Sequence, residues 1–318
     1  MSGMNLTVIG QGLTADRVDA MHAGLAVMGV ADASVIVADD FVSTVNDLTS
    51  QQSYSTGRGA GVVAARTIPG DDGSTIVVNG PETRNRSPQL IERLLAHEAG
   101  HIWLNERKER LEGRRRLVGA DWEWWLLCIG GLALDELRIE RSLADLGYPT
   151  ANAGTMAYAE NALYCLNVEV VDALLDPASA DIMTFSQSIM KTHDWLAKQL
   201  AYLAAFRSDA TEPGLAGLST HAKENWEDYI GSTWDSRVVL YESVPTALDP
   251  ISDADLNELL VGSKRQEEAQ LAKLGFRYAS FGDGFSFHRT ASDTLCNVRA
   301  QRALEETGIR EKAQQRSG

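Results

Sequence analysis

Apolar positions near the start of the chain follow two different spacings. Short apolar runs at residues 5–9 and 33–38 have the length and composition of buried strands, and residues 15–28 between them repeat apolar side chains at helical intervals. Two β-prone runs follow at residues 62–68 and 75–79, separated by a turn rich in proline, glycine and aspartate. The pattern predicts a β-α-β start and then a hairpin. If the 75–79 strand lies at the sheet edge, it can hold an extended peptide by strand addition.

From residue 87 onward the apolar spacing is mostly helical. Ser87 is a good N-cap and Pro88 suits the first helical position, which predicts a helix over residues 87–105. Asp121 can cap a second long helix that ends near residue 146. Further helices are expected at residues 151–175, 180–206, 221–229 and 295–315, with strands at 238–241 and within 276–287. The fold class is therefore α+β, with a small mixed sheet followed by a mostly helical region.

The glycines after the first strand resemble part of a dinucleotide-binding turn. Gly10, Gly12 and Ala15 fit the pattern G-x-G-x-x-G/A, and Asp39 or Asp40 stands where an acidic partner is expected. No further β-α-β units follow, so we favour an ordinary turn over a nucleotide site.

Composition narrows the classes of function. The chain has 318 residues, 44% of them hydrophobic, with 29 basic and 44 acidic residues and a formal net charge of −15. This charge argues against nucleic acid as a partner. Three widely spaced cysteines predict neither a disulfide framework nor a cysteine zinc site. Neither a signal peptide nor a membrane helix is expected, so we predict a cytoplasmic protein without a membrane partner.

The residues His97-Glu98-Ala99-Gly100-His101 form an H-E-x-x-H motif inside the predicted 87–105 helix. Two histidines four residues apart share one helix face, so their imidazoles can bind one Zn²⁺, and Glu98 is then a candidate general base. Both histidines continue the apolar stripe of the helix. The alternative interpretation is a buried, hydrogen-bonded histidine pair in the core.

Two histidines do not complete a catalytic zinc site, which needs three protein ligands and one open position. Leu104 and Arg107 stand where the extended motif H-E-x-x-H-x-x-G-x-x-H would have its glycine and third histidine. A glutamate is the next choice. Glu136 follows Ile129 and Leu132 at helical spacing, so its side chain points in the same direction as these apolar neighbours.

Other interpretations of this acidic segment stay open. Asp135 and Glu140 are alternative third ligands. Glu136 can also be explained as half of a surface salt bridge with Arg138, Arg141 or the arginines at 114–116.

The motif and the acidic helix after it resemble the gluzincin class of zinc metallopeptidases. In that class a glutamate on a following helix completes H-E-x-x-H, and an acidic residue four places later orients a zinc-bound histidine. Glu136-x-x-x-Glu140 matches this arrangement, with Glu140 in place of the usual aspartate. The order of strand, motif helix and glutamate helix also resembles the ImmA/IrrE-type intracellular endopeptidases. The resemblance covers roughly residues 57–149.

This resemblance implies a single-zinc metallopeptidase acting on a protein or peptide. Residues 1–150 would form a zincin-like catalytic domain, and the helical region 151–318 would close one side of its cleft. Zn²⁺ would be bound by His97, His101 and Glu136, and Glu140 would orient one histidine. Glu98 would act as general base towards a metal-activated water. The alternatives are a non-hydrolytic binding or regulatory protein on the same scaffold and an aminopeptidase.

Zincins often add a side chain that stabilises the oxyanion of the tetrahedral intermediate. Spacing does not select one here, and the candidates are Tyr148, Tyr158, Tyr164, His193 and His221.

Overall fold

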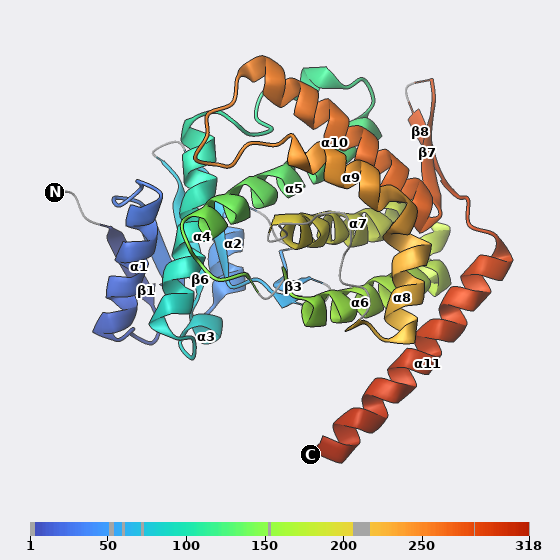
Figure 1. The fold of residues 1–318 in the computed structure, drawn as a ribbon, viewed down its shortest axis with the longest axis horizontal. Helices are drawn as coiled ribbons and strands as arrows, with labels where there is room; N and C mark the ends of the chain where they lie inside the picture. Colours follow the sequence, from blue (N-terminus) through green and yellow to red (C-terminus); the bar gives the residue numbers. More distant parts are fainter. Residues whose placement is uncertain are drawn as a thin grey trace. The chain divides into compact units, whose positions relative to one another are not determined.

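The computed structural model describes residues 4–50, 54–58, 61–70, 73–151, 154–205, 217–282 and 284–317 (Figure 1). Its contacts divide the chain into two compact units. One consists of Met1–Arg110, Arg138–Pro149 and Thr246–Pro250, and the other of Leu111–Leu137, Thr150–Pro245 and Ile251–Gly318. The helix α5 (Asp121–Asp145) belongs to both, because the division falls inside it.

The first unit is built on a four-stranded mixed sheet in the order β1-β2-β6-β5. The strands β1 (Asn5–Ile9), β2 (Ser34–Ala38) and β6 (Thr75–Asn79) are parallel, and β5 (Ala65–Ile68) pairs antiparallel with β6. A short ladder joins β3 (Gly57–Arg58) and β4 (Gly61–Val62). The predicted α+β class, the β-α-β start and the β5–β6 hairpin are confirmed.

Helices cover both faces of this sheet. On one face, Val35, Val37, Ile76 and Val78 share a buried core with residues of α1 (Ala15–Val27), α4 (Pro88–Glu106) and the C-terminal part of α5. On the other face, α2 (Phe41–Thr49) packs on Ile68 and Val77. The short helix α3 (Gly80–Thr83) links β6 to the turn before α4. The sheet thereby supports α4, which carries the H-E-x-x-H motif.

The strand β6 is not an edge strand. It pairs with β2 on one side and with β5 on the other, so its backbone groups are occupied by both neighbours. The expectation that residues 75–79 could accept an added peptide strand is therefore wrong. The edge next to α4 is β5 instead, because the hairpin folds β5 to the outside of the sheet.

The turn after β1 is explained by a contact within the protein. Gly10 has a φ of 113°, and a Cβ there would lie 2.2 Å from Asp39 Oδ2. That carboxylate accepts the backbone N–H of Gln11 at 2.9 Å and forms an ion pair with Arg84. Asp39 thus stabilises the glycine turn, in agreement with the favoured interpretation of this segment.

The second unit is mostly helical. It contains α6 (Met156–Leu175), α7 (Ile182–Ala205), α8 (Thr220–Trp226), α9 (Ser232–Glu242), α10 (Asp253–Leu274) and α11 (Asp293–Ser317), with short helical turns at Arg115–Leu117, Pro177–Ala180 and Glu227–Gly231. A two-stranded hairpin joins β7 (Phe276–Phe281) and β8 (Gly284–Arg289). Figure 1 shows α6 and α7 side by side, and α8 also packs on α6.

The elements predicted for this region are present in part. The strand expected at residues 238–241 is wrong, because these residues belong to α9, whose Val238 and Tyr241 are buried at helical spacing. The helix α10 was not anticipated from the sequence. The helices predicted at 151–175 and 180–206 are present as α6 and α7, and residues 152, 153 and 206 lie outside the described part.

None of the helices in the described part of the chain combines the length and the apolar character that spanning a bilayer requires.

Candidate metal centre

The helix α4 brings the three motif residues together. Ser87 caps its N-terminus by accepting the backbone N–H of Leu90, and Pro88 occupies the first turn. His97 and Glu98 are 7% and 6% exposed, so the motif lies against the interior of the protein. The imidazole rings of His97 and His101 lie 5.0 Å apart, centroid to centroid, on one helix face. One face of the helix therefore presents two imidazole groups that could bind the same metal ion.

The helix α5 packs closely on α4 at the level of the motif. A Cβ added to Gly100 would lie 2.8 Å from side-chain carbons of Ile139, so the glycine permits this close approach. One residue along α5, Glu140 contacts His97: Glu140 Oε1 lies 2.7 Å from His97 Nδ1. The glycine inside the motif thus has a packing role that the motif alone does not indicate.

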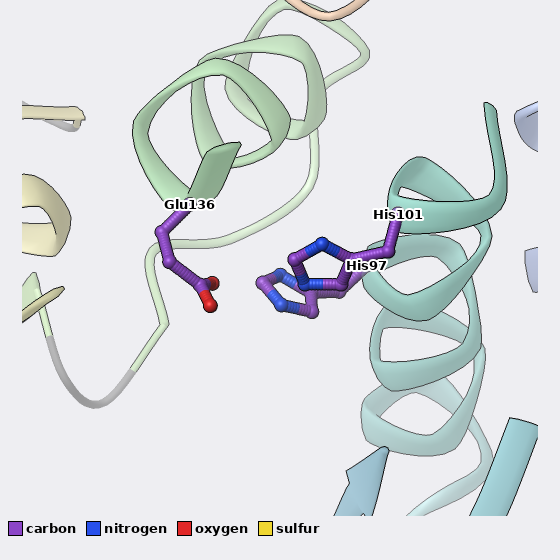
Figure 2. A group of neighbouring side chains, drawn as sticks. All are labelled: His97, His101 and Glu136. Atoms are coloured by element: carbon purple, nitrogen blue, oxygen red, sulfur yellow. The ribbon is translucent and has the colours of Figure 1, made fainter. Parts of the chain in front are cut away.

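Three side chains converge on a position where a metal ion fits. One ligand atom from each of His97, His101 and Glu136 lies within 4.8 Å of the others. In Figure 2 the carboxylate of Glu136 faces the two imidazole rings across the gap between the helices. Asp135 is buried on α5 but is not in this group, and Glu140 contacts His97 instead. Of the three acidic candidates, Glu136 is the one grouped with both histidines in the described part of the chain.

The donor set suits zinc. Two imidazole nitrogens and one carboxylate oxygen are the ligands of many catalytic zinc sites, which keep the fourth position open. A metal-binding histidine usually directs its second ring nitrogen to a carboxylate, which fixes the tautomer. Glu140 occupies Nδ1 of His97, so Nε2 is the nitrogen left to face the metal. The residues present therefore fit a single zinc ion.

A buried arginine supports this arrangement. Arg93, one turn before His97 on α4, forms an ion pair with Glu140 Oε2 and donates from Nε to the carbonyl of Pro149 at 2.8 Å. Glu140 is fully buried and Arg93 is 8% exposed. A buried carboxylate needs a charged or hydrogen-bonding partner on each oxygen, and here Arg93 and His97 provide one each.

Glu98, the candidate general base, accepts a hydrogen bond from a residue of the sheet. Thr67 on β5 donates its hydroxyl to Glu98 Oε2 at 2.7 Å. The edge strand of the sheet therefore reaches the carboxylate in the middle of the motif.

A tyrosine contacts the third candidate ligand. Tyr202 on α7 donates its hydroxyl to Glu136 Oε2 at 2.9 Å. Sequence reasoning missed Tyr202, Thr67 and Arg93. Arg93 could have been found from the sequence, because it lies four residues before His97 and therefore on the same helix face. Thr67 and Tyr202 come from distant elements that no local pattern connects to the motif.

Contacts of the oxyanion candidates lie with residues outside the metal group. Four of them share a hydrogen bond with a neighbouring side chain: Tyr148 with Glu92, Tyr164 with Thr307, His193 with Glu267, and His221 with Glu224. Burial and Glu92 raise the pKa of Tyr148, and burial raises the pKa of Tyr158. These contacts assign none of the five to the metal centre.

Comparison with protein-family models, with curated proteins and with solved structures gives no match for this chain.

Proposed function

We propose that this chain is a zinc-dependent metallopeptidase that hydrolyses peptide bonds in a protein or peptide substrate. The observation that carries the proposal is the convergence of His97, His101 and Glu136 on one point, with Glu98 between the two histidines in the motif. A metal site for structure alone needs four protein ligands and no base. Three ligands beside a glutamate are instead typical of a hydrolytic site.

Each residue of the group has a role in this proposal. His97, His101 and Glu136 bind the metal, and Glu140 holds the His97 ring in the required tautomer. When bound, zinc supplies a Lewis acid that polarises a carbonyl group and acidifies water. Glu98 accepts a proton from the water that attacks the peptide carbonyl and then donates this proton to the leaving amine.

The sheet edge offers a place for the substrate. The strand β5 ends the sheet on the side of α4, and its residue Thr67 contacts Glu98. An extended peptide that pairs with β5 would pass beside the proposed base. The proposal therefore includes an extended segment of polypeptide as substrate, and an endopeptidase as the type of enzyme. The cytoplasmic location inferred from the sequence belongs to the same proposal.

The test combines metal analysis with digestion. The purified chain is expected to bind one zinc ion and to cut an unfolded protein mixture at internal bonds, and a chelator should stop the cutting. Glu98→Gln should keep the zinc and lose the activity. Glu106→Gln is a matched control, because Glu106 is exposed at the end of the same helix. Full activity of Glu98→Gln would refute the assignment of the base.

The same experiment separates the alternatives. Zinc binding without any cleavage would identify a binding or regulatory protein. Trimming of free N-termini would identify an aminopeptidase. Absence of zinc from the wild-type chain would overturn the metal centre itself.

A further inference from the structure

The hydroxyl of Thr67 is placed to hold one oxygen of Glu98. It lies 2.7 Å from Glu98 Oε2 and 3.1 Å from the backbone carbonyl oxygen of Glu98. A hydroxyl has one hydrogen to donate, so the shorter contact with the carboxylate is the principal one. A hydrogen bond to a charged acceptor is also the stronger type.

The register of the hairpin explains why Thr67 faces the motif. Thr67 is opposite Ile76 in the β5–β6 ladder, and Ile76 points into the core that α4 shares with the sheet. Ile68, the residue after Thr67, points to the other face of the sheet, where α2 packs. Side chains alternate along a strand, so a shift of one residue would turn Thr67 away from α4. The contact is thus set by the pairing of two strands and does not depend on a flexible loop.

We propose that Thr67 is a positioning residue for Glu98, an inference that rests on the proposed peptidase function. A glutamate side chain has several rotamers, and a general base works only within hydrogen-bonding distance of the proton that it accepts. Thr67 holds Oε2 and so limits the carboxylate to one orientation beside the metal ligands. An error of about 1 Å in such a group can lower a rate by about a hundredfold. The hydroxyl acts through Glu98 and makes no contact with substrate in this proposal.

Two variants at this position separate the hydroxyl from the shape of the side chain. Thr67→Val keeps the volume and removes the donor, and we expect kcat to fall about tenfold to a hundredfold with KM and zinc content unchanged. Thr67→Ser keeps the donor and should restore kcat. Thr75→Val is a matched control, because Thr75 lies opposite Ile68 and therefore on the other face of the sheet.

A second measurement decides the inference without turnover. Crystal structures of the zinc-loaded wild type and Thr67→Val should show the Glu98 carboxylate in the Thr67-bound orientation in the first and in a different rotamer in the second. An unchanged carboxylate in Thr67→Val, or equal kcat in the two proteins, would overturn the role of Thr67. A wild type that binds zinc and cuts nothing refutes the proposed function instead, and the pair of structures then still tests the positioning.

Discussion

The buried series Arg93–Glu140–His97 allows a measurement that separates fold stability from metal affinity. Glu140 is fully buried and interacts with the other two through different oxygens. Three variants are required: Arg93→Met, Glu140→Gln and the double variant. Arg93→Met keeps an unbranched apolar side chain in place of the arginine stem but removes the charged guanidinium group. Glu140→Gln retains an oxygen that can accept from His97 but removes the negative charge that Arg93 needs.

The stability effect follows from burial. Each single variant leaves one buried charge without its counter-charge, a change that costs about 3–5 kcal/mol of unfolding free energy. The double variant removes both charges, so its loss should be smaller than the sum of the two by about 1–3 kcal/mol. The measurement is urea unfolding of the metal-free proteins, because bound zinc would add its own stabilisation.

The two single variants should differ in their effect on zinc affinity. Glu140 contacts His97 directly, so Glu140→Gln should weaken zinc binding about tenfold to a hundredfold, or roughly 1.4–2.7 kcal/mol. Arg93→Met keeps the carboxylate on His97 and should change the zinc affinity much less. Competition with a chelating indicator measures both. Strictly additive losses of stability, or equal losses of zinc affinity in the two single variants, would refute this reasoning.

Three further outcomes are expected. Glu136→Ala removes a proposed ligand, so the zinc affinity measured by chelator competition should fall by more than the ~100-fold typical of a lost supporting contact. An unchanged zinc affinity would show that Glu136 is not a ligand. Gly24→Ala should lower the free energy of unfolding by about 1–3 kcal/mol, because a Cβ there would lie 2.2 Å from a backbone oxygen of α4; an unchanged melting temperature would contradict this close packing. Burial alone would raise the pKa of Glu267, but Arg237 and His193 outweigh it and lower the pKa from 4.5 to about 2. The resulting stabilisation is present above pH 4.5, and up to roughly 3 kcal/mol should be lost as the pH falls through about 2. Urea unfolding between pH 6 and 2 measures this loss of unfolding free energy. An equal loss in Glu267→Gln would show that Glu267 is not its cause.

The parts of the site that could be predicted depend on the spacing of residues that are close together in the sequence. Ser87 and Pro88 define the start of α4, and the interval of four residues between His97 and His101 places both rings on one helix face. The orientation of Glu136 followed from the same periodicity on α5. Such features depend on residues within a few turns of each other, so a sequence contains them directly.

The features that could not be predicted depend on pairing between distant segments. Whether β6 lies at the edge or inside the sheet is decided by the fold-back of β5, and two adjacent β-prone runs are compatible with either order. Residues 238–241 are apolar and β-branched in part, which favoured a strand, but packing of α9 in a helical unit overrides that propensity. The contact of Tyr202 with Glu136 spans 66 residues, so no periodic pattern reports it.

The geometry of the metal group explains why a long separation in sequence does not prevent it from forming. His97 lies next to Glu140, and His101, one turn later on α4, joins Glu136, one turn earlier on α5. On each helix the two residues are four positions apart, so they lie one turn from each other on the same helix face. The ligand positions are set by these two helix faces, and the length of the segment between α4 and α5 does not determine them. Those positions depend on how closely the helices approach, which is why the packing of Gly100 on Ile139 is a direct part of the proposed chemistry.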